Sequence, residues 1–205
     1  MIDNKEKMVS VYAEASPNPE SMKFVMNAVL LPEGQSVDYP NLESAMESPL
    51  AQELFNFDYV SRVFIASNFV TVTKNSDIEW VKLIPELRTF LKSYTEAGGP
   101  VFNEGFSAKA GPQTTNADGS VASEEDEAIS KKIIDLLNNY VRPAVEQDGG
   151  NISFKSYDKG VVTVHLQGSC SGCPSATVTL KAGIENLLKR MVPEVTEVVA
   201  DGVTV

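Results

Sequence analysis

The feature that most constrains this chain is a segment of loop-like composition, residues 98–123, which separates two patterned regions. It reads GGPVFNEGFSAKAGPQTTNADGSVAS and keeps neither the alternation of a strand nor the spacing of a helix. We interpret it as a flexible linker, which at this length spans about 25–30 Å. The alternative for Phe102 and Phe106, which are unusual in a linker, is transient docking. The 205 residues therefore divide into domains over 1–97 and 124–205, each long enough to bury a core.

The first half of the first domain predicts two strands and a helix. The strands are expected over 8–14 and 22–31, because the Pro-rich run 16–19 between them disfavours helix. The segment 42–55 suits a helix that begins close to Pro40.

The second half of this domain predicts a hairpin and a further helix. Two runs of β-branched and aromatic residues, 59–66 and 69–74, indicate the hairpin. Ser76 and Glu79 have the spacing of a capping box, and Pro85 indicates that the helix kinks or begins later. The first domain is therefore expected to be α+β, in the order ββαββα.

The second domain has a clearer pattern. A helix capped by Ser123 is expected to run to Tyr140, with a break or kink at Pro143. Alternating residues around the turn 158–160 predict an antiparallel hairpin. A further helix and a short strand over 195–199 complete the order αββαβ, again α+β.

Composition and charge exclude several classes of protein. No apolar run approaches the roughly 20 residues that cross a bilayer, so a membrane protein is not expected. The opening MIDNKEKMVS has no apolar core of a secretory signal, which favours a cytoplasmic location. The net charge of -11 argues against binding to a nucleic-acid backbone.

The chemistry of the chain is concentrated in its two cysteines, Cys170 and Cys173. In a reducing compartment such a close pair is more often catalytic or metal-binding than a structural disulfide. Pro174 fits the first turn of the following helix, so both sulfurs are expected close to a helix N-terminus that stabilises thiolate. Thiolates are soft ligands that suit zinc, Cu(I) or iron–sulfur clusters.

One chain supplies too few ligands to close such a site. A structural zinc site or an iron–sulfur cluster takes four protein ligands, and His165 is more often a strand residue than a ligand. The simplest closure is a homodimer in which two cysteine pairs meet. Two alternatives remain: a thiol–disulfide oxidoreductase, disfavoured because the motif lies in αββαβ rather than in a βαβ unit, and a zinc-stapled interaction module. The choice between [4Fe–4S] and [2Fe–2S] also stays open.

Longer motifs resemble a known family. The runs 140–152 and 168–177 look like the NifU C-terminal, or Nfu-type, domain, while 17–24, 48–51 and 69–74 with Trp80 look like the Nfu N-terminal domain.

The resemblance implies a scaffold or carrier for iron–sulfur clusters that is not an enzyme. It implies that Cys170 and Cys173 bind a cluster, usually [4Fe–4S], between two subunits. It also implies client apoproteins and upstream assembly proteins as partners. For Arg142 with Asp148 and Gly149-Gly150, two interpretations stay open: an ion-paired helix end, or a surface beside the cluster that helps dimerisation or delivery.

Overall fold

The computed structural model describes residues 8–106, 124–171 and 174–201. The chain separates into two compact units, Met1–Lys109 and Ala110–Val205, and each is described by itself. Both combine helices with a sheet, so the predicted α+β class is confirmed. None of the helices within these described ranges is long and apolar enough to cross a bilayer.

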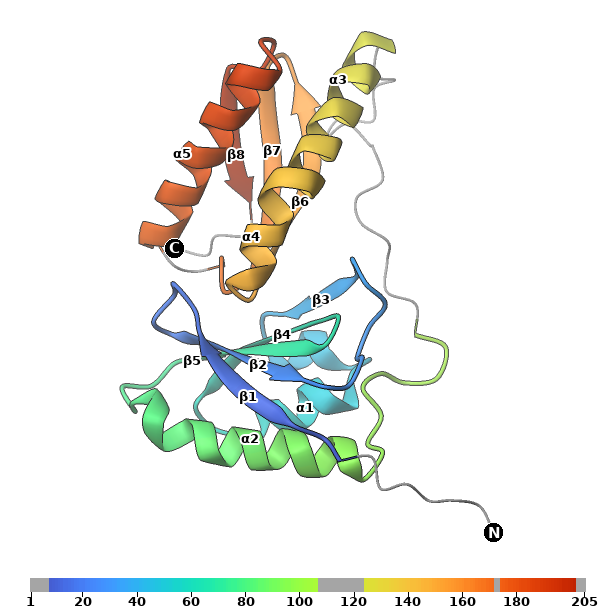
Figure 1. Cartoon of the computed structure of the whole chain (residues 1–205), viewed down its shortest axis with the longest axis vertical. Helices are drawn as coiled ribbons and strands as arrows, with labels where there is room; N and C mark the ends of the chain where they lie inside the picture. Colours follow the sequence, from blue (N-terminus) through green and yellow to red (C-terminus); the bar gives the residue numbers. More distant parts are fainter. Residues whose placement is uncertain (1–7, 107–123, 172–173, 202–205) are drawn as a thin grey trace. The chain divides into compact units, whose positions relative to one another are not determined.

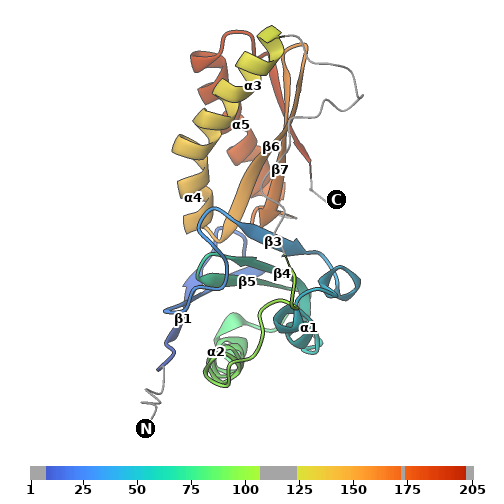
Figure 2. The same cartoon turned by 90° about the vertical axis from the view of Figure 1, so that its right-hand side faces the viewer.

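The first unit is a five-stranded antiparallel sheet with helices on one face. Its strands lie in the order β1-β2-β5-β4-β3. The helices α1 and α2 lie on the same side of this sheet in two perpendicular views (Figures 1 and 2). In chain order the elements are β1 (Val11–Ala15), β2 (Ser21–Met26), β3 (Ser36–Tyr39), the 3-10 turn η1 (Leu42–Ala45), α1 (Pro49–Phe55), β4 (Val60–Ala66), β5 (Phe69–Lys74) and α2 (Trp80–Glu96).

Alternation along the strands builds the core of this unit. Phe24, Val63 and Val72 lie on the helix-facing side and are fully buried, together with Leu87 and Leu91 of α2. The predicted β4–β5 hairpin is confirmed, and its turn leaves Ala66 opposite Phe69. Ser67 in this turn has a positive φ of 34°, as tight hairpin turns require.

Two local predictions for this unit are wrong. The helix expected over 42–55 is divided, because Asn41 caps the short turn η1 and Ser48 begins a separate helix α1 with Pro49 in its first turn. The capping box of Ser76 and Glu79 does not form, since α2 begins one residue after Glu79 without a side-chain cap. Strand β3 was not expected.

The structure differs from the predicted linker at its beginning. Residues 98–106 pack on the first unit, where Ser48 Oγ donates a hydrogen bond of 2.7 Å to the Val101 carbonyl. The rings of Phe102 and Phe106 stack with their centroids 4.0 Å apart and contact the core. The remainder of the predicted linker lies outside the described residues, so the predicted domain boundaries remain a prediction.

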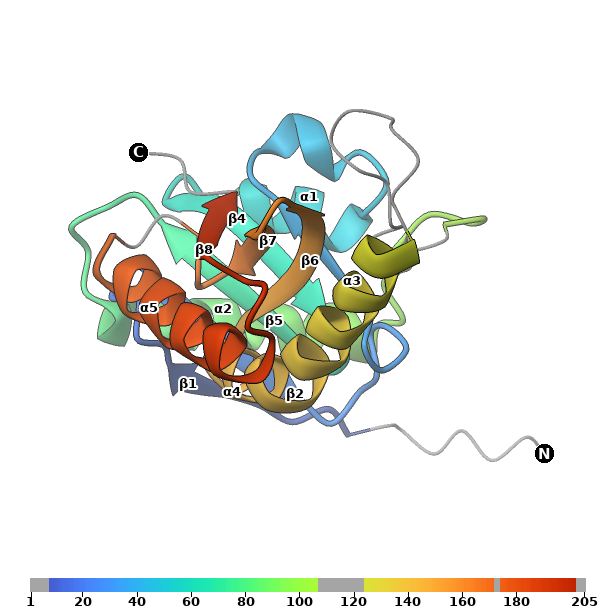
Figure 3. The ribbon, with the colours of Figure 1, turned by 90° about the horizontal axis from the view of Figure 1, so that it is seen from above.

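The second unit is a three-stranded sheet, in the order β6-β7-β8, with helices on one face. Seen from above, α3 and α5 lie side by side against the sheet, as they also do in the first view (Figure 3). In chain order the elements are α3 (Glu124–Leu136), the π-helical turn η2 (Leu137–Val141), α4 (Arg142–Gln147), β6 (Gly150–Asp158), β7 (Val161–Gly168), α5 (Pro174–Met191) and β8 (Glu197–Asp201).

Local chemistry accounts for the breaks in this unit. The helical path does not stop before Pro143, because the π-helical turn η2 leads directly into α4. Pro143 lies in the first turn of α4, where its missing N–H costs no hydrogen bond. The predicted hairpin of β6 and β7 is confirmed. Lys159 and Gly160 both have positive φ, 48° and 89°, the combination that favours the tightest hairpin turns. Ser123, the predicted cap of α3, lies outside the described residues.

Candidate thiolate site

The cysteine motif lies in the turn that joins β7 to α5. Cys170 is two residues beyond the end of β7 and is only 8% exposed, because it packs against the apolar core of the second unit. Cys173 lies outside the described residues. The structure therefore places one of the two predicted ligands, and it places this ligand in a buried turn.

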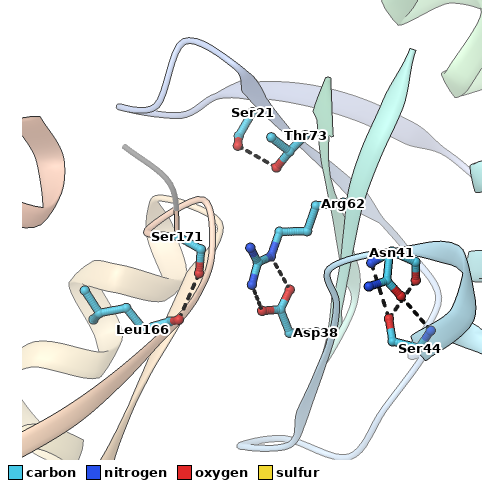
Figure 4. Close-up of polar contacts among 8 residues, drawn as sticks. All are labelled: Ser21, Asp38, Asn41, Ser44, Arg62, Thr73, Leu166 and Ser171. Carbon is cyan, nitrogen blue, oxygen red and sulfur yellow. Dashed lines mark hydrogen bonds and ion pairs between the residues drawn. The ribbon is translucent and has the colours of Figure 1, made fainter. Parts of the chain in front are cut away.

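The two serines that flank Cys170 hold this turn. Ser169 Oγ donates a hydrogen bond of 2.7 Å to the Asp148 carbonyl at the end of α4. Ser171 Oγ donates a bond of 2.8 Å to the Leu166 carbonyl on β7, and its side chain is directed back toward that strand (Figure 4). Both serines are 2% exposed. Because one residue is anchored on each side, the backbone at Cys170 is fixed between α4 and β7.

Two glycines give this turn its path. Gly149 follows the last turn of α4 with a φ of 83°, and its carbonyl accepts from the Ser169 N–H at 3.2 Å. Gly168 ends β7 with a φ of 64°, and its carbonyl accepts from the Ser171 N–H at 3.0 Å. Only glycine adopts such values without strain. The glycines at the ends of α4 and β7 therefore also bind the backbone of the two anchoring serines on either side of Cys170.

The anchoring serines are the residues of the candidate site that sequence reasoning missed. The signal was present, because small polar residues on both sides of a cysteine are suited to hydrogen bonds with their own backbone. Their partners at Asp148 and Leu166 depend on the packing of α4 beside β7, which no local pattern shows.

His165 does not join a ligand group with Cys170. As the alternation of β7 predicts, it lies on the half-exposed face of the sheet, opposite in parity to the buried Val164 and Leu166. Its neighbour on β8 is Asp201. Within 8–106, 124–171 and 174–201, no three His, Cys, Asp or Glu side chains gather as a metal site would need.

Arg142 does not make the ion pair with Asp148 that the first of the two interpretations, an ion-paired helix end, expects. It begins α4, and its Nε is buried without a hydrogen-bond partner in the described part of the chain. No ion pair joins it to Asp148 or to any other described acid. The glycine half of that interpretation is correct, because Gly149 ends α4 with a left-handed backbone.

The helix after the motif is tied to the far strand of the sheet. Glu185 on α5 accepts hydrogen bonds from Lys189 and from the Val198 N–H of β8, at 2.6 and 3.1 Å. These two bonds lower the pKa of the Glu185 carboxyl. Burial acts in the opposite direction on Tyr157 and raises the pKa of its hydroxyl. The cysteine turn is thus followed by a helix that is held to β8.

One argument from the sequence is wrong. The motif does lie in a βαβ unit, because β7 and β8 are parallel neighbours and α5 connects them. The pairing of Val162 with Val198 joins segments that are distant in the sequence, so the local pattern could not predict it. The topological argument against a thiol–disulfide oxidoreductase therefore falls.

Two α+β units, the second with a cysteine in an anchored strand-to-helix turn, define a two-domain thiol protein. The family described as "Scaffold protein Nfu/NifU N terminal" matches residues 11–98, and the family described as "NifU-like domain" matches residues 133–199. The chain thus carries both domains in the order that its motifs predict.

Relatives that match most of this chain agree with these matches. A protein named "NFU1 iron-sulfur cluster scaffold homolog, mitochondrial" from Drosophila willistoni is 38% identical over 94% of this chain and 64% of its own length. "NifU-like protein 4, mitochondrial" from Arabidopsis thaliana is 38% identical over 95% of this chain and 66% of its own length. A Drosophila persimilis relative with the same name as the first is 38% identical over 95% of this chain and 68% of its own length. The chain belongs to the Nfu/NifU-like family, and it spans about two thirds of the length of these relatives.

The same relatives correct the predicted location. A cytoplasmic protein was expected from the first residues, whereas the relatives are named mitochondrial. The prediction is wrong because it used the start of the sequence as its only guide, although the relatives are longer than the matched region.

Proposed function

We propose that this chain is an iron–sulfur cluster scaffold that holds its cargo, a [4Fe–4S] cluster, on Cys170 and Cys173 of two chains and transfers it to apoproteins. The observation that carries the proposal is the position of Cys170. It lies in a turn anchored by Ser169 and Ser171, in the unit that matches the NifU-like domain. A relative of this chain is named as an iron–sulfur cluster scaffold homolog.

The ligand count supports a site shared between chains. Four thiolates hold a cluster of either common type, and the sequence contains two cysteines. A second copy of the chain supplies the missing pair without any other ligand type. Since thiolate is the soft ligand that iron–sulfur clusters use, the donor set fits the cargo.

The residues of the chain have separate tasks in this proposal. Cys170 and Cys173 bind the cargo, while Ser169 and Ser171 keep the Cys170 backbone in place during loading and release. The first unit recognises client apoproteins or the upstream assembly proteins that donate the cluster. The scaffold performs no catalytic turnover, because ligand exchange to the client's own thiolates transfers the cargo.

Anaerobic reconstitution with iron and sulfide tests the proposal. The unmodified chain is expected to gain the absorbance of a cluster, with iron and sulfide in equal amounts. Cys170→Ser and Cys173→Ser are each expected to lose it, because a hydroxyl replaces a soft thiolate. His165→Ala is the matched control: it lies on the half-exposed sheet face and is expected to load normally.

Three other results contradict the proposal. Full loading of Cys170→Ser shows that this thiolate is not a ligand. A colourless protein that retains zinc supports the zinc-stapled module. A Cys170–Cys173 disulfide with a measurable reduction potential, in a chain that takes up no iron, supports the oxidoreductase.

A further inference from the structure

Gly150 occupies a position where a side chain has no room. It is the first residue of β6 and pairs with Gly168 at the end of β7. A Cβ at this position would lie 2.7 Å from Cys170 Sγ and 2.8 Å from the Gln167 carbonyl oxygen. Real Cβ atoms essentially never come within 3.0 Å of another heavy atom, so both approaches are too close. The sulfur therefore lies in the space that any other residue would fill.

Backbone conformation does not explain the glycine. Gly149, its neighbour, has a φ of 83° and ends α4, which is sufficient reason for glycine there. Gly150 is not among the residues with positive φ. The two glycines of the Asp-Gly-Gly run thus serve different purposes: the first turns the chain, and the second leaves room.

The space above Gly150 is specific to the cysteine turn. A Cβ would also meet Ser169 Oγ at 3.2 Å, and this is the hydroxyl that anchors the turn to Asp148. The sulfur, the anchoring hydroxyl and the Gln167 carbonyl therefore converge on one missing methyl group. Most of what a side chain at position 150 would displace belongs to the turn that carries Cys170.

We infer that Gly150 is a positioning residue for the Cys170 thiolate, because the missing Cβ fixes where Sγ lies. The inference rests on the proposed function in one respect, the role of Cys170 as a ligand. A methyl group at position 150 forces Cys170 into another rotamer, and the three staggered positions of its side chain leave few alternatives. The sulfur then leaves its buried position, and the geometry offered to the cargo changes.

The rate of alkylation of Cys170 tests the position of the sulfur without any cluster. The full-length Cys173→Ser chain, with Cys170 as its one remaining thiol, is treated with iodoacetamide under reducing, anaerobic conditions. In Gly150→Ala the reaction is expected to be roughly tenfold faster, because thiol reactivity depends on exposure. The matched control is Gly183→Ala on α5, where a Cβ meets nothing within 4 Å and the rate is expected to stay unchanged. An unchanged or slower rate in Gly150→Ala overturns the inference.

Cluster loading, measured separately in chains that keep both cysteines, completes the test. Gly150→Ala is expected to bind the cluster about 10–100-fold more weakly, as replacements beside metal ligands do. Equal loading of Gly150→Ala and the unmodified chain overturns the positioning role, while the scaffold function stands. If the unmodified chain takes up no cluster, the scaffold function fails, and the alkylation rates still decide where Sγ lies.

A stability measurement covers the case in which Gly150→Ala does not fold. In a Cys170→Ala background the nearest contact, that with Sγ, is absent, while the contacts with Gln167 and Ser169 remain. Gly150→Ala is therefore expected to destabilise the second unit less in this background than in the unmodified chain. An equal loss of stability in both backgrounds shows that the sulfur is not what the methyl group displaces, and it overturns the inference.

Discussion

The anchor of the cysteine turn makes a direct prediction for Ser171→Ala. The Ser171 hydroxyl is buried and donates 2.8 Å to the Leu166 carbonyl, so its removal costs one hydrogen bond inside the second unit. A net hydrogen bond contributes about 1 kcal/mol, and a buried acceptor left without its donor raises the cost to about 1–3 kcal/mol. Because the Leu166 carbonyl also lies in a strand, where further donors are near, we expect the lower half, about 1–2 kcal/mol.

Urea unfolding of the full chain measures this cost unit by unit. With a slope of about 1–1.5 kcal/mol/M for a domain of this size, the midpoint of the second unit is expected to fall by about 1 M. Hydrogen exchange of peptides from β6 and β7 reports that unit. Fluorescence of Trp80, the single tryptophan, reports the first unit and serves as an internal reference.

The control is the same substitution at a position without the bond. Ser153 on β6 is half-buried, and its hydroxyl makes no hydrogen bond within the described part of the chain. Ser153→Ala is expected to change stability by less than about 0.5 kcal/mol. The reasoning is refuted if Ser171→Ala and Ser153→Ala have the same midpoint, or if the midpoint of the first unit moves with that of the second.

Three further predictions concern the packing of the two units. Ile152→Ala removes a fully buried side chain from the second unit and is expected to cost about 2–5 kcal/mol by hydrogen exchange, with no change in the Trp80 signal. Burial, and next the Glu47 carboxylate, raise the pKa of the Tyr39 hydroxyl, so deprotonation favours the unfolded chain. The free energy of unfolding of the first unit is therefore fully present below about pH 10 and falls above it by up to about 1.4 kcal/mol per pH unit. Tyr39→Phe removes this part of the pH dependence, which Trp80 fluorescence at pH values on both sides of 10 checks. Gly183→Ala places a methyl group in open space within a helix and is expected to stabilise the second unit by about 0.5–1 kcal/mol. The urea midpoint of the second unit checks this, and a midpoint below that of the unmodified chain contradicts it.

Sequence patterns predicted the elements that depend on residues close together in the chain. The hairpins at Ser67-Asn68 and at Lys159-Gly160 were predicted because turn residues and strand alternation lie within a few positions of one another. The break at Pro143 was predicted for the same reason, since proline acts on its own turn.

The elements that sequence patterns missed depend on contacts between distant segments. The four-residue strand β3 is held by its pairing with β4, and Ser36 and Asp38 gave it no apolar signature. The parallel pairing of β8 with β7 was likewise invisible, although the segment itself was expected as a strand. The docking of Phe102 and Phe106 was expected only as a transient alternative, because it depends on a surface formed by the rest of the first unit.

The sequence predicted the cysteine ligands of the candidate site, but not the residues that hold and make room for Cys170. Thiolate character and spacing pointed to Cys170 and Cys173, because the residue type itself carries that information. The space above Gly150 and the anchors at Ser169 and Ser171 arise only when α4 and β7 come together. A glycine pair or a serine has many ordinary uses, so the local pattern alone did not single these residues out.

Native mass spectrometry of the anaerobically reconstituted full chain tests the central claim most directly. The account predicts a species with the mass of two chains plus one cluster of four irons and four sulfides, and it predicts that Cys170→Ser lacks this species. A single chain that carries a complete cluster, or a pair of chains that keeps the cluster after Cys170→Ser, would contradict it.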